Sequence, residues 1–103
     1  MDAQRGAQDM GKVAFTLITD SRNGQGYPQL QQRIGLVKQA LDRLPGLTLS
    51  GSPVMHYTFP SSPRCEQWRI TVTITKAGRA TSWNDVYRAV NATGPAPHYR
   101  HIR

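Results

Sequence analysis

Two side chains suited to proton transfer lie close together in the apolar segment "PVMHYTF", residues 53–59. His56 supplies an imidazole, a group that can serve as an acid or a base, and Thr58 supplies a hydroxyl two positions later. Residues two apart in a strand point to the same face, so the imidazole and the hydroxyl would lie side by side. This pair is either half of a catalytic site or the solvent-facing side of an ordinary strand.

The segment "HYTF", residues 56–59, resembles one half of the site in the two-histidine phosphoesterases. In that family two such motifs, one from each half of the fold, supply a pair of acid–base histidines and phosphate-binding hydroxyls. The resemblance implies these roles for His56 and Thr58. This chain has one copy only, because other residue types follow His98 and His101. A solvated His56 on a strand is therefore the favoured interpretation.

The other residues with reactive side chains are scattered along the chain. Cys65 is the one cysteine, which excludes an intrachain disulfide, and no histidine close in sequence could activate its thiol. His98 and His101 are three apart without a cluster of further ligands. We therefore predict no catalytic residue, no metal and no cofactor, and an enzyme is the third choice of function.

The charge of the chain is its most informative overall property. Its 103 residues include 13 Lys and Arg against 6 Asp and Glu, a net charge of +7. Most of the basic residues are arginines, and the excess lies mainly after residue 63. The planar guanidinium group suits phosphate and carboxylate recognition. A small domain can also carry this much charge for solubility alone.

One domain is expected at this length. We predict a flexible leader over residues 1–10, a single domain over 11–94 and a basic, proline-containing tail over 95–103. No apolar run is long enough for a signal peptide or a membrane span, so a cytoplasmic protein without a membrane partner is expected.

Strands are predicted over residues 12–19, 47–59 and 66–75, and helices over 28–44 and 83–93. The last of these strands alternates apolar Trp68 and Ile70 with polar Arg69 and Thr71, which is typical of an antiparallel strand with one buried face. The strand over 47–59 should break at "SGSP", because Pro53 cannot donate to a central ladder.

The order of these elements predicts an α+β fold. We expect a two-layer sandwich, in which two helices cover one face of an antiparallel sheet in a ferredoxin-like βαββα(β) arrangement. The helices would cover the Trp68 side and leave the Arg69 side open.

On the neighbouring strand, Met55, Tyr57 and Phe59 make the better inward set. His56 should then point outward beside Arg69, and the open face should lack aromatic side chains. Base stacking on that face is not expected, which favours contacts with phosphates.

Two functions from different classes remain. The first is a small, basic, non-catalytic domain that binds nucleic acid through salt-sensitive phosphate contacts. The second is a structural or assembly protein, for example of a virion type, which associates with itself or another chain through its open sheet face or the edge strand at Pro53. The residues predicted to form the binding surface are Arg64, Arg69, Arg79, Arg100 and His56.

Overall fold

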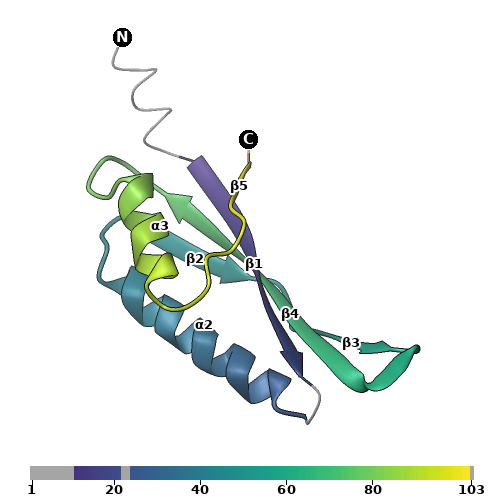
Figure 1. The fold of residues 1–103 in the computed structure, drawn as a ribbon. Coiled ribbons are helices and arrows are strands. Elements are labelled where there is room, and N and C mark those ends of the chain that lie inside the picture. The colour runs from purple at the N-terminus through teal and green to yellow at the C-terminus, as the bar shows by residue number, and fades with distance from the viewer. Residues whose placement is uncertain (1–10, 22–23, 103) are drawn as a thin grey trace.

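The computed structural model describes residues 11–21 and 24–102, with the side chains of 62–64 left out. The predicted leader lies outside this range. The described chain forms an α+β fold with a five-stranded antiparallel sheet and two helices (Figure 1). The elements are β1 (Gly11–Ser21), α2 (Gly26–Asp42), β2 (Leu47–Gly51), β3 (Met55–Phe59), β4 (Ser62–Lys76), α3 (Trp83–Asn91) and β5 (Arg100–Ile102).

The two longest strands, β1 and β4, pair side by side from Gly11↔Lys76 to Ser21↔Glu66. β5 adds to the other edge of β1, whereas β2 and β3 follow one another along the outer edge of β4. The order is β2-β4-β1-β5, with β3 also beside β4. The described sheet has one strand more than predicted, because the predicted strand over 47–59 is interrupted at 52–54.

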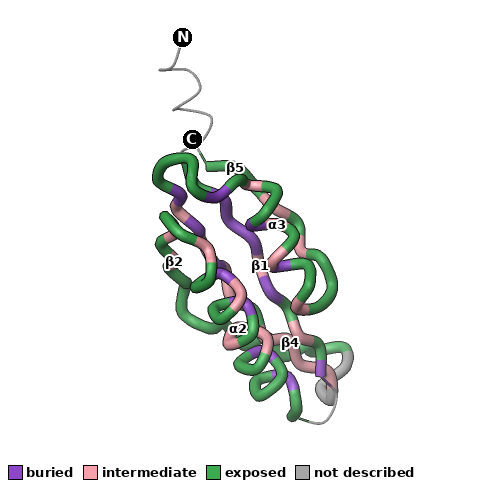
Figure 2. The backbone as a smooth tube through the Cα atoms, turned by 90° about the vertical axis from the view of Figure 1, so that its left-hand side faces the viewer, coloured by how far each residue is buried: buried purple, intermediate pink, exposed green. Residues whose placement is uncertain are grey.

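Both helices pack against the same side of the sheet. An apolar stripe of α2 is buried there, and buried positions run along β1 and the facing turns of α2 (Figure 2). Burying each large apolar side chain contributes about 1.5–3 kcal/mol. The buried cluster consists of Phe15, Leu17, Leu30, Val37, Leu41, Val72, Ile74, Val86 and Val90.

The beginning of α2 is fixed against the ends of β1 and β4. Thr19 Oγ1 donates to the Gly26 carbonyl at 2.7 Å, and the Gln25 N–H donates to Ser21 Oγ at 2.8 Å. A Cβ atom on Gly26 would lie 2.6 Å from Cδ1 of Trp68. Trp68 therefore lies under the helix, on the side that the alternation predicted.

A serine caps the start of α3. The Asp85 N–H donates to Ser82 Oγ at 3.1 Å, so Ser82 is the N-cap of this helix. Beside this helix, the buried Lys76 donates to the Gly78 carbonyl at 2.9 Å, and its Nζ lies 5.7 Å from the centre of the Trp83 ring. The segment predicted as a tail contains β5, the optional last strand of the prediction.

The hairpin of β3 and β4 extends past the helices (Figure 1). All five residues of β3 are exposed. This end of the sheet therefore presents both of its faces to solvent.

Candidate functional site

The sheet face opposite the helices carries the predicted polar set of β4. Arg69, Thr71 and Thr73 alternate with the core residues of that strand, as predicted. The register places Thr16 of β1 opposite Thr71, and their hydroxyl oxygens are 3.1 Å apart. The middle of this open face is therefore a neutral, hydrogen-bonding surface.

An aromatic side chain and a cation lie together at the hairpin end of the open face. Cζ of Arg69 is 4.8 Å from the centre of the Tyr57 ring. Met55 and Ile18 are the two cross-strand neighbours of Arg69, and both are about half exposed. A guanidinium over a ring is worth about 0.5–1 kcal/mol at an exposed site. We call Ile18, Met55, Tyr57 and Arg69 the open-face cluster.

A hydrogen-bond chain orients the arginine of this cluster. Arg69 Nε donates to the side-chain oxygen of Gln67, whose Nε2 donates to Asp20 Oδ1 at 2.7 Å. Asp20 is the one carboxylate on the described part of the open face, and Gln67 already engages it. The guanidinium thus keeps its positive charge available beside the Tyr57 ring.

The prediction that His56 points outward is wrong. His56 pairs with Trp68 on the helix side of the sheet, where their rings stack with centres 4.1 Å apart. Its Nε2 lies 3.0 Å from Glu66 Oε2. Correspondingly, Met55 and Tyr57 pair with Arg69 and Gln67, so they lie on the open face rather than inward.

A β-bulge explains this reversal. Phe59 pairs with Ser62. A regular hairpin with that register would place His56 opposite Cys65, a position on the same face of β4 as Arg69. The register shifts between Thr58 and Phe59, and this places His56 opposite Trp68 instead. A bulge changes the face of every residue beyond it. The "PSSP" sequence marks a turn but gives no count of the residues that bulge.

The environment of Glu66 favours its charged form. The pKa of the Glu66 carboxyl is lowered, first by the neighbouring Trp68 indole N–H and then by His56. Glu66 Oε1 and Trp68 Nε1 are buried without a hydrogen bond of standard geometry. The pair of His56 and Glu66 therefore joins β3 to β4 beside the start of α2.

The opposite end of the open face is basic. Arg100 and Ile102 of β5 pair with Ala14 and Lys12 of β1, so all four lie in the outward set. Ala14 and Ile18 are four residues apart along β1, a distance of about 13 Å. Cations from three strands therefore lie on one face, at two separate places.

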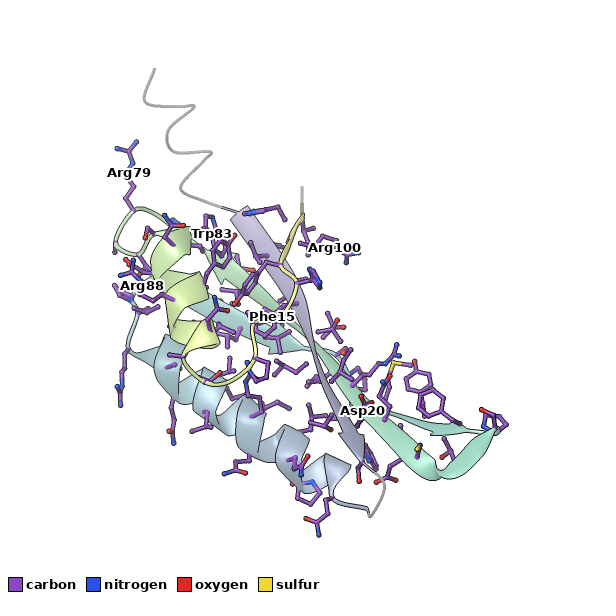
Figure 3. The ribbon with its side chains drawn as sticks, in the orientation of Figure 1. Phe15, Asp20, Arg79, Trp83, Arg88 and Arg100 are labelled. Carbon is purple, nitrogen blue, oxygen red and sulfur yellow. The ribbon has the colours of Figure 1, made fainter. Side chains whose placement is uncertain are left out.

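The remaining predicted residues do not join this face. Arg79 lies in the loop between β4 and α3, and Figure 3 shows it on the other side of the molecule from Arg100. Arg64 belongs to β4, but its side chain lies outside the described part of the structure. Of the five predicted residues, the structure brings Arg69 and Arg100 onto the same surface.

A groove runs beside β1 on the free side of that strand. It has a volume of about 690 Å³. Its walls are formed by residues 16–20 of β1, by one side of α2 and by the segment 93–98. Arg33 of α2 fixes that segment through hydrogen bonds of 2.9 Å to Thr93 Oγ1 and to the Pro95 carbonyl.

No metal centre is apparent in the part of the chain that the structure describes. None of its His, Cys, Asp and Glu side chains form a group of three that could hold an ion. Likewise, no described helix is both long and apolar enough to cross a membrane.

Comparison with known proteins gives little to set beside this geometry. No protein-family model matches the chain, and no curated protein sequence matches it. Among solved structures, the chain is similar to the YxeP protein of Bacillus subtilis, a dinuclear metal binding peptidase from the M20 family. The match has 10% identity and a TM-score of 0.39, and it covers 90% of this chain but 26% of the peptidase.

Proposed function

We propose that the protein binds single-stranded nucleic acid on the open face of its sheet, without catalysing a reaction. The observation that carries this proposal is the side-by-side placement of Tyr57 and Arg69 on that face. An exposed aromatic ring offers a surface for a base, and a neighbouring guanidinium offers a contact for its phosphate.

Charge on the same face supports the proposal. Lys12, Arg69 and Arg100 come from three different strands, and the threonine rows between them offer hydrogen bonds to sugar and phosphate oxygens. The chain as a whole carries +7. An open sheet face with a stacking group suits splayed, unpaired bases better than a duplex.

The test is fluorescence anisotropy with a labelled 15-nucleotide oligo-dT strand and a duplex of the same length. We expect the single strand to bind more tightly. Three phosphate contacts predict that log K falls with log salt with a slope of roughly −2. A slope near zero, or equal binding of the duplex, would contradict the proposal.

Two variants locate the site. Tyr57→Ala should weaken binding by about 1–3 kcal/mol, the range for loss of one stacked base, with little change in the salt slope. Arg69→Glu should weaken binding and also make the slope shallower. The matched control is Arg88→Glu, because Arg88 is exposed on α3 in the other layer (Figure 3). If Arg88→Glu weakens binding as much as Arg69→Glu, the open face is not the site.

We also infer that the fold is a ferredoxin-like arrangement whose outer strand is divided into β2 and β3. What supports this is the central pair of β1 and β4, with α2 leading from β1 to the β2 edge and α3 leading from β4 to β5. An experimental structure with a different strand order would contradict it.

A further inference from the structure

β1 has an unpaired edge along half of its length. β5 pairs with residues 12–14 only, whereas β1 continues to Ser21. Figure 1 shows β5 beside the first part of β1 alone. No described strand pairs with this side of β1 after Ala14. An open strand edge is a template for pairing with another chain.

The register identifies the backbone groups on this edge. The N–H and C=O of Thr71 point away from β1, because they bond to Ser52 at 2.9 Å each. Thr16 is opposite Thr71, so its own N–H and C=O point away from β4 and toward the free edge. The same alternation applies to Ile18 and Asp20. These three residues therefore present donors and acceptors to an incoming strand.

Exposed apolar side chains lie on both sides of this edge. Ile18 is 50% exposed on the open face, and Leu36 of α2 is 44% exposed in the groove beneath. In an added strand, the side chains that point to the open face would cover Ile18, and the side chains that point to the helix side would cover Leu36. The slot over residues 16–20 is about as long as an average strand.

The charges along the slot differ between its two ends. Arg33 and His98 line the groove, and Arg33 is bonded to the segment that leads into β5. Arg100 lies opposite Ala14, at the same end, whereas Asp20 lies at the other end (Figure 3). A strand with the same charges that ran antiparallel would bring its acidic end to the basic end of this slot.

We propose that this slot holds β1 of a second copy of the chain, in an antiparallel pair about a two-fold axis at Ile18. Ile18 then faces the partner's Ile18, and Thr16 faces the partner's Asp20. Roughly six backbone hydrogen bonds join the strands. The partner's Asp20 would be opposite Thr16, and Arg100 is opposite Ala14, two residues earlier on β1. The two residues would therefore be about 7 Å apart along the edge of β1, within reach of an ion pair. A parallel pair would instead place the two Asp20 carboxylates at the same end.

The dimer makes one continuous sheet with two open-face clusters near its centre. It does not depend on nucleic acid, so it is tested on protein that has been purified free of it. Both copies carry +7, and 0.3 M NaCl limits the repulsion to a Debye length of roughly 5–6 Å.

The first test is sedimentation equilibrium and light scattering in 0.3 M NaCl. The chain should have twice its monomer mass of 11.5 kDa. Ile18→Lys places two ammonium groups at the two-fold axis, and it should raise the dimer dissociation constant at least about tenfold. The matched control is Val54→Lys, at an exposed residue on the other edge of the sheet, which should change the constant less than about twofold. A monomer at all concentrations, or equal effects of both variants, would overturn the proposal.

The second test does not depend on the stability of a lysine variant. In a Cys65→Ser background, Ile18→Cys should form an intermolecular disulfide on mild oxidation, because opposite residues of a hydrogen-bonded pair have Cα atoms about 5.5 Å apart. Val54→Cys in the same background should not. If Ile18→Cys remains monomeric on non-reducing gels, β1 does not pair with itself and the proposal is overturned.

Discussion

β4 passes through two regions that differ in what covers them. From Val72 to Lys76 it lies beside β1 and β2 beneath the helices, and Val72, Ile74 and Lys76 are buried. From Ser62 to Arg69 it pairs with β3, whose residues are all exposed. One strand thus serves two purposes: its second half belongs to the hydrophobic core, and its first half carries the exposed strand β3, with Trp68 packed against the core at the junction.

The largest effect should separate these two regions by stability. Ile74 is fully buried, and Ile74→Ala should reduce the free energy of unfolding by about 2–5 kcal/mol. Met55 is 51% exposed, and Met55→Ala should change it by less than about 0.5 kcal/mol. Urea unfolding followed by circular dichroism measures both. Similar losses would show that the hairpin belongs to the core and would remove the distinction.

A smaller effect should appear at the junction of the two regions. A Cβ atom on Gly26 would lie 2.6 Å from Trp68 Cδ1 and 3.0 Å from Ser21 Cβ, so Gly26→Ala should cost about 1–3 kcal/mol. In the same helix, a Cβ atom on Gly35 would meet no atom within 4 Å. Gly35→Ala should therefore stabilise the protein by up to about 1 kcal/mol. Opposite signs in urea unfolding support close packing at the junction, and two stabilising substitutions would refute it.

The smallest effect should come from pH. The pKa of Glu66 is lowered in the folded state by the Trp68 indole and then by His56, so its stabilising contribution is present above the unfolded pKa and lost as pH falls through the folded pKa. The urea midpoint of the protein should therefore fall more between pH 7 and pH 3 than that of Glu66→Gln. If the two urea midpoints fall equally, the charge of Glu66 does not contribute to the stability of the hairpin junction.

The sequence allowed the covered region to be predicted well. The spacing of Leu30, Val37 and Leu41 is that of a helical stripe, and the alternation from Trp68 to Ile74 is that of a half-buried strand. These patterns are reliable because one face must be apolar where a helix covers it.

The exposed region could not be predicted in the same way. No covering layer imposes a pattern on β3, and the bulge beside Phe59 reverses its faces, so Tyr57 and His56 exchanged their expected sides. Arg69 could be assigned to the open face from its own strand. The placement of Arg100 beside Ala14 depends on β5, three residues long, which the sequence indicated only as an optional strand.

The stacking of His56 on Trp68 and the placement of Lys76 over Trp83 have a practical consequence. The two tryptophans of the chain lie in different parts of the molecule, one at the hairpin junction and one at the start of α3 in the helical layer. Each is therefore an intrinsic fluorophore for its own part of the molecule. Emission from Trp68→Phe and Trp83→Phe variants would report local opening of the hairpin separately from global unfolding, without an attached dye.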